Sequence, residues 1–141
     1  MHAERVFVDA NTIVSGLLFE GNESMLLELG AFRAVELVTN HYVLSEVRRV
    51  LRRVEFGLTE KEIQNLIGYL HQAVLIADDP SEAAVRACAD KLTDKKDGRV
   101  WAGYESSGAS HLVTGDKELL EKVDGALRTS DSLRMILKAS G

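Results

Sequence analysis

Short apolar segments alternate with longer amphipathic ones along the chain, and this alternation constrains the fold more than any other feature. Five segments rich in Val, Leu and Ile have the length of strands, the last of them weaker: residues 5–9, 35–39, 73–77, 111–114 and 126–130. Their polarity does not strictly alternate, which is typical of strands buried on both faces of a parallel sheet. Helical patterns occupy residues 11–19, 22–32, 41–54, 59–72, 81–92, 98–107, 116–123 and 131–138. The order predicts an α/β fold with helices on both faces of the sheet.

Local signals set several helix boundaries. Gly57 is expected to end the basic helix before it, and Thr59 with Glu62 predicts a capping box at the start of the next one. Pro80, the only proline, is expected to open a helix, where its missing N–H costs little. Cys88 has Ala and Val neighbours, which favours a buried structural thiol over a nucleophile.

Length and composition indicate one folded unit. A chain of 141 residues, 45% hydrophobic and 28% charged, is expected to form a single globular domain over residues 1–141. No apolar run approaches the ~20 residues of a membrane helix, and no secretory signal is recognisable, so we expect a cytoplasmic protein without a membrane partner. The net charge of −5 argues against coating nucleic acid by bulk attraction but allows a local basic patch.

Two acids directly follow strand-like segments. Asp9 ends the first segment, and Asp116 follows the fourth in the sequence LVTGD. Ligands of open α/β sheets bind outside the carboxyl ends of the strands, where the strand order reverses. Each acid is also well placed to cap the helix that follows it, so either one alone is evenly balanced between a site and a cap.

Two further acids lie at the edges of apolar helix faces. Glu46 is about 100° from Val47, at the rim of a stripe formed by Val43, Leu44, Val47, Leu51 and Val54. Asp97 lies one turn ahead of Val100 and Trp101. Asp94, three residues before it, is a candidate N-cap, and Asp97 would then lie in the first turn, where its charge favours the helix dipole. An ordinary solvated Glu and a capping Asp are the alternatives for these two residues.

If these four acids converge, their charges must be compensated. Like charges ~4 Å apart repel by roughly 1–4 kcal/mol per pair, depending on the effective dielectric. Either some carboxyl groups retain protons at raised pKa values, or a hard divalent cation binds them. An all-oxygen site favours Mg²⁺ or Mn²⁺, since the histidines His41, His71 and His111 are scattered along the chain.

With these four acids in order, the chain resembles the PIN-domain family of metal-dependent ribonucleases, and in particular stand-alone members regarded as toxins of toxin–antitoxin pairs. The resemblance covers the segments RVFVDANTIVSGLL, VTNHYVLSEVRRVLRR and DGRVWAGYESSGASHLVTGDKELL. It implies a three-layer α/β/α sandwich around a parallel sheet of about five strands, in the order 3-2-1-4-5. Close members carry a denser acidic cluster around the third acid, and whether Asp94 assists here stays open.

The resemblance also implies a mechanism. Asp9, Asp97 and Asp116 would hold Mg²⁺ or Mn²⁺, while Glu46 would bind a second ion or orient the water that attacks RNA. Polar residues expected to fix the carboxylates are Asn11, Thr12, Ser15 and Thr114, although ordinary cap and turn roles are favoured for Thr12 and Thr114. Basic residues expected to contact phosphates are Arg49, Arg53, Lys96 and Arg99, whereas Arg48 and Arg52 suggest a solvated face. A separate antitoxin and a homodimer are the expected partners besides RNA.

Three other classes compete with this interpretation. A haloacid-dehalogenase-like phosphatase requires an acid two residues after the first, where this chain has Asn11. A receiver domain requires paired acids near the start, where this chain has only Glu4. The strongest rival is a PIN scaffold with a weak or silent site that acts as an RNA- or protein-interaction module.

Overall fold

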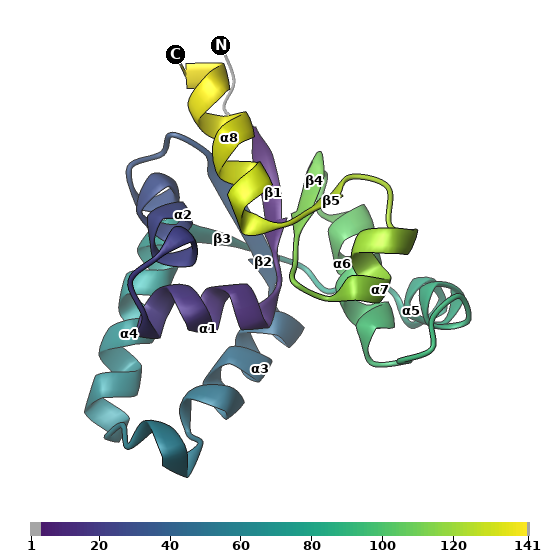
Figure 1. Ribbon diagram of the computed structural model, residues 1–141. Coiled ribbons are helices and arrows are strands. Elements are labelled where there is room, and N and C mark those ends of the chain that lie inside the picture. The colour runs from purple at the N-terminus through teal and green to yellow at the C-terminus, as the bar shows by residue number, and fades with distance from the viewer. Residues whose placement is uncertain (1–3, 141) are drawn as a thin grey trace.

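The computed structural model describes residues 4–140 and contains the predicted parallel sheet. Its five strands lie in the order β3-β2-β1-β4-β5, and every neighbouring pair is parallel (Figure 1). The strands are β1 (Arg5–Val8), β2 (Glu36–Asn40), β3 (Val74–Ala77), β4 (His111–Val113) and β5 (Ala126–Leu127). The predicted fold class and strand order are therefore confirmed.

Helices cover both faces of this sheet. They are α1 (Ala10–Leu18), α2 (Asn22–Ala31), α3 (His41–Leu51), α4 (Glu60–Ala73), α5 (Glu82–Ala89), α6 (Asp97–Ser106), α7 (Lys117–Lys122) and α8 (Thr129–Ser140). Because parallel crossovers are right-handed, helices α1–α4 lie on one face and α5–α7 on the other. Helix α8 returns to pack against α2 (Figure 1).

The central strands form the core. Val6, Phe7 and Val8 of β1 and Leu112 of β4 have no exposed surface, which explains their continuous apolar sequence. Helix α6 approaches the sheet closely at Gly103, where a Cβ atom would lie 2.3 Å from Asn40 Nδ2. This close packing fixes α6 and places its first residue, Asp97, at the carboxyl end of the sheet.

Some expected boundaries are wrong. The helix predicted over residues 41–54 ends at Leu51, and Val54, assigned to its apolar stripe, is 95% exposed in a 3₁₀ turn. That turn ends at Gly57, whose φ of 60° is left-handed. The fifth strand has two residues rather than five, because α8 begins at Thr129.

Capping follows the sequence signals in part. Thr59 and Glu62 form the predicted capping box of α4. Pro80 does not open α5, because the side chain of Ser81 caps that helix. Asp94 is not the N-cap of α6 either; that position is Lys96, whose N–H donates to Asp94 Oδ1 at 3.1 Å. Cys88 is buried in the core as expected.

Within residues 4–140, no helix combines the length and apolar character needed to cross a bilayer.

Candidate active site

The carboxyl ends of β1 and β4 open into an acidic cleft. The strand order reverses between these two strands, so the position is the switch point at which ligands of open α/β sheets bind. The cleft encloses about 290 Å³ and is lined by all four predicted acids, Asp9, Glu46, Asp97 and Asp116, together with Asp94. Four separate elements, β1, α3, α6 and the β4–α7 turn, thus bring these carboxyl groups into one cavity.

Thr114 connects two of the acids. Its hydroxyl donates to Asp9 Oδ2 at 2.8 Å and accepts the backbone N–H of Asp116 at 3.1 Å. The parallel register pairs Val8 with Val113, so the next residues, Asp9 and Thr114, face each other where the strands end. Thr114 therefore holds the Asp9 carboxyl group, a role beyond that of an ordinary turn residue.

Asp9 and Asp116 also act as helix caps. Asp9 Oδ1 accepts the N–H of Ala10 at 2.6 Å at the start of α1, and Asp116 Oδ1 accepts the N–H of Leu119 at 2.9 Å in α7. The capping alternative and the site alternative are thus compatible, because each residue caps a helix while it lines the cleft.

Electrostatics within the cleft disfavour a full set of negative charges. Burial, followed by the charges of Asp116, Asp94 and Asp9, raises the pKa of Asp97 to about 7. Burial likewise raises the pKa of Asp9, against the opposing effect of its hydrogen bonds from Thr114 and Ala10. Within residues 4–140, no cationic group is among the causes that shift the pKa of Asp9 or Asp97.

Glu46 is an exception because it has a cationic partner. Arg49 donates to Glu46 Oε2 from Nη2 at 2.6 Å and from Nε at 3.2 Å, one turn along α3. Arg49 was expected to contact phosphate; here its guanidinium is engaged with Glu46 at the wall of the cleft.

The other predicted phosphate contacts divide into two groups. Arg53 and Lys96 line the cleft with exposed side chains. Arg99 departs from the expectation, since its guanidinium pairs with Glu82 of α5 at 3.1 and 3.3 Å and lies 5.5 Å from the ring centroid of Tyr42. This ion pair directs Arg99 along the rim of α5 and α6 rather than into the cavity.

Sequence reasoning missed Tyr42. Its ring lines the cleft, and burial followed by the charge of Glu46 raises the pKa of its hydroxyl, with Asp97 contributing further. The available signal was the spacing, because Tyr42 and Glu46 are four residues apart and share one face of α3.

The remaining predicted polar residues lie on the far side of Asp9. Asn11 lines both the acidic cleft and a neighbouring cavity, whereas Thr12 and Ser15 line only that neighbouring cavity. None of these three side chains hydrogen-bonds to an acid within residues 4–140.

The donor chemistry of the cleft suits a hard cation. Its acids offer only oxygen, and the pKa of Asp97, raised first by burial and then by the neighbouring carboxylates, would be lowered by a bound cation. Yet no group of three or more His, Cys, Asp or Glu residues between Glu4 and Ser140 is arranged as a ready-made metal site. The residue types fit Mg²⁺ or Mn²⁺, and the carboxyl groups would need to turn toward it.

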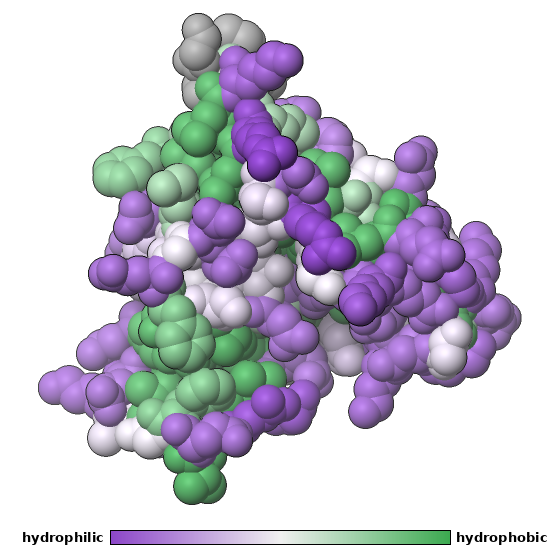
Figure 2. Space-filling model, in the orientation of Figure 1, coloured by the Kyte–Doolittle hydropathy of each residue, from purple (hydrophilic) through white to green (hydrophobic). Residues whose placement is uncertain are grey.

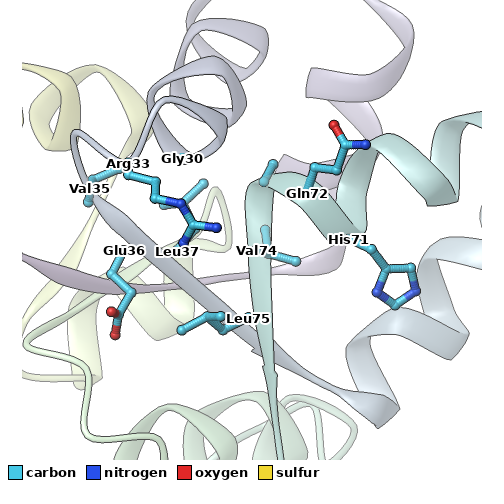
Figure 3. A pocket seen from close by; sticks show the side chains of 10 residues that line it. Gly30, Arg33, Val35, Glu36, Leu37, His71, Gln72, Val74 and Leu75 are labelled. Carbon is cyan, nitrogen blue, oxygen red and sulfur yellow. The ribbon is translucent and has the colours of Figure 1, made fainter.

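A different cavity of about 220 Å³ lies at the opposite end of the sheet, beside the first residues of β2 and β3 (Figure 3). Its charged and polar side chains do not converge, since Glu36 and His71 lie on opposite sides of it. The amino ends of parallel strands are not where such folds bind ligands, so the acidic cleft is the better candidate.

Comparison with known proteins agrees with the fold. A family model described as "PIN domain" matches residues 5–118, so this chain belongs to the PIN-domain family. The chain is also similar to a solved structure, "Crystal Structure of PAE2754 from Pyrobaculum aerophilum", with 22% identity, 98% of each chain covered and a TM-score of 0.65. At this identity the likeness shows the fold alone. No curated protein matches the chain.

Proposed function

We propose that this protein is a Mg²⁺- or Mn²⁺-dependent endoribonuclease, in a fold that nucleases commonly use. The observation that carries the proposal is the convergence of Asp9, Glu46, Asp97 and Asp116 on one cleft at the switch point. Helix capping at this edge accounts for the positions of Asp9 and Asp116 but not for those of Glu46 and Asp97.

The ligands would be Asp9, Asp97 and Asp116, with Glu46 beside them. A divalent cation, when bound, supplies polarisation of a phosphodiester oxygen and a lower pKa for bound water. Thr114 orients Asp9, because its hydroxyl donates to the Asp9 carboxyl group. Glu46, steadied by Arg49, is placed to orient the attacking water. Arg53 and Lys96 are the cations available to phosphate on the strand.

The test is Mn²⁺-dependent cleavage of single-stranded and structured RNA by the wild type, Asp9→Asn and Asp116→Asn. We expect the wild type to cleave and both variants to lose most activity, since each loses a charged ligand. Equal cleavage by all three proteins would assign the activity to a contaminant or to another site.

A catalytically silent PIN scaffold is the second candidate. The observation that favours it is the commitment of Asp9 and Asp116 to helix caps, without a ready-made group of metal ligands among the described residues. Titration with Mg²⁺ separates the candidates. No binding, with no difference between wild type and Asp9→Asn, would favour the interaction module.

The toxin role, a separate antitoxin and a homodimer extend the same proposal. The apolar faces of α2 and α4 are core, with Leu26, Leu27 and Leu70 buried, so a dimer would use other residues. Phe19 and Phe32, which are 62% and 82% exposed, are available for such contacts. Analytical ultracentrifugation of the wild type and a Phe32→Ser variant tests the dimer.

A further inference from the structure

A second cavity of about 270 Å³ adjoins the acidic cleft. Asn11 lines both cavities, and the Thr114–Gly115 turn separates the second from Asp116. Figure 2 shows pale, near-neutral residues flanked by hydrophilic ones at the centre of the face on which α8 begins. Glu23 and Arg128 are the charged residues of its lining, so the second cavity has no excess of acids, unlike its neighbour.

Three helices begin at this cavity. Asn11 lies in the first turn of α1, Asn22 is the first residue of α2, and Thr129 is the first residue of α8, and all three line it. Figure 1 shows α8 beginning above α1 and beside α2. The first N–H groups of a helix have no partners within it and carry partial positive charge, so three helix starts favour an anion.

Two buried hydroxyl groups point to a ligand independently of the helix starts. Thr12 and Thr129 line the cavity and are only 7% and 8% exposed. Neither hydroxyl group has a hydrogen-bond partner within residues 4–140. They are also not sealed in the core, because the only sealed, unpartnered side-chain polar atom in that range is Asn40 Nδ2. Both hydroxyl groups therefore keep accessible surface, and the cavity that both residues line is where a ligand could satisfy them.

The cavity is lined by one cationic and one anionic side chain. Arg128, immediately before α8, contributes a guanidinium group, and Glu23 in the first turn of α2 contributes a carboxylate. A guanidinium, hydroxyl groups and helix N–H groups are the donors that bind phosphate oxygens. Glu23 opposes an anion, which suits a site that must release its ligand.

We propose that this cavity binds a phosphodiester phosphate of the RNA strand whose scissile phosphate lies in the acidic cleft. The RNA assignment rests on the proposed function, whereas binding of phosphate itself does not. Asn11, on the shared wall, marks the path of the strand between the two cavities.

The first experiment measures binding of inorganic phosphate to metal-free protein by NMR titration. We expect Arg128→Gln to weaken binding about tenfold or more and Thr12→Val to weaken it several-fold, because each removes a donor. Glu23→Gln should strengthen binding, since it removes the opposing charge. Arg134→Gln is the matched control, because Arg134 is an exposed arginine of α8, the helix that Arg128 precedes, and pairs with Asp131 outside the cavity. It should bind like the wild type.

Two controls keep this result interpretable. Arg53→Gln, in the acidic cleft, reports any phosphate bound there: a loss of phosphate affinity in Arg53→Gln without a loss in Arg128→Gln would assign binding to the acidic cleft and overturn the proposal. Glu23→Gln alters a surface charge, so its gain in affinity does not depend on variants that fold poorly. No binding by the wild type, or equal binding by all variants, would overturn the proposal.

The second experiment uses a short single-stranded RNA with the metal-free protein, so that no cleavage occurs. A set of RNAs carries one neutral methylphosphonate linkage each, at successive positions along the strand. At one position the neutral linkage should weaken RNA binding to the wild type but not to Arg128→Gln. If RNA binding weakens only when a terminal phosphate is removed, the assignment to an internal linkage is overturned. If the protein never cleaves RNA but binds phosphate through Arg128 and Thr12, the proposed function fails while the anion site stands.

Discussion

Asp97 and Glu118 occupy the first turns of neighbouring helices, yet their surroundings differ completely. Glu118 accepts the N–H of Thr93 at 2.9 and 3.0 Å and the ammonium group of Lys122 at 2.8 Å, and these donors lower its pKa to about 2. Asp97 is partly buried and faces Asp116, Asp94 and Asp9, and burial first and then these charges raise its pKa to about 7. Since both residues benefit from a helix dipole, burial and the neighbouring groups distinguish a structural acid from a candidate ligand.

The largest expected effect is a difference in RNA cleavage between variants of Asp97 and Glu118. We expect Asp97→Asn to lower kcat/KM for RNA by more than the ~10–100-fold typical of losing a partner of a metal ligand. Glu118→Gln should lower it by less than about tenfold, because Glu118 only steadies the turn before α6. Steady-state cleavage of a labelled RNA measures both. Similar losses for both variants would break the comparison.

The next effect concerns Thr114, which connects Asp9 to the backbone of Asp116. Thr114→Val keeps the shape of the side chain but removes the hydroxyl group, and we expect Mn²⁺ affinity to fall about 10–100-fold. Thr114→Ser retains the hydroxyl group and is the matched control. Isothermal titration with Mn²⁺ measures both variants, and equal affinities would show that the bond does not orient Asp9.

Most of the fold and the four acids that line the cleft were predictable from the sequence, because both depend on local patterns. Asp9 and Asp116 were recognisable because the strands of a parallel sheet end at one edge. Glu46 was recognisable because the helical period places it at the rim of an apolar stripe. Arg99 was not predictable, because its partner Glu82 depends on how α5 packs against α6. The exposure of Val54 was likewise hidden, since periodicity does not reveal that the helix stops at Leu51.

In the metal-free protein, Asp97 and Glu118 should also make the free energy of unfolding depend on pH in opposite directions. Asp97 titrates at about 7 when folded and ordinarily at 3.8, so between these values the folded state holds a proton that the unfolded state has released. The free energy of unfolding should therefore fall as pH rises through this window. Glu118 has a folded pKa of about 2 against an ordinary 4.5, so its stabilisation is complete above 4.5 and is lost as pH falls toward 2.

Urea unfolding at a series of pH values measures this profile. Asp97→Asn should flatten the decline toward high pH, and Glu118→Gln should flatten the decline toward low pH. Mg²⁺ should reduce the high-pH decline in the wild type, because it competes with the proton for the same carboxyl groups. A high-pH decline that is unchanged in Asp97→Asn would assign it to another group, with Asp9 the first alternative.

The smallest effect tests where Glu46 belongs in this comparison. Glu46 lines the cleft like Asp97, but Arg49 compensates its charge as Lys122 compensates that of Glu118. The pair is solvent-exposed on the Arg49 side, so Arg49→Gln should shift Tm by less than about 2 °C.

If Arg49 steadies Glu46 rather than binding phosphate, the Arg49→Gln variant lowers kcat and leaves the salt dependence of RNA binding unchanged. Arg53→Gln should do the reverse, reducing the slope of log K against log salt by about 0.7, the value for one phosphate contact on a single strand. A reduced slope in Arg49→Gln would place Arg49 on the RNA and leave Glu46 as uncompensated as Asp97.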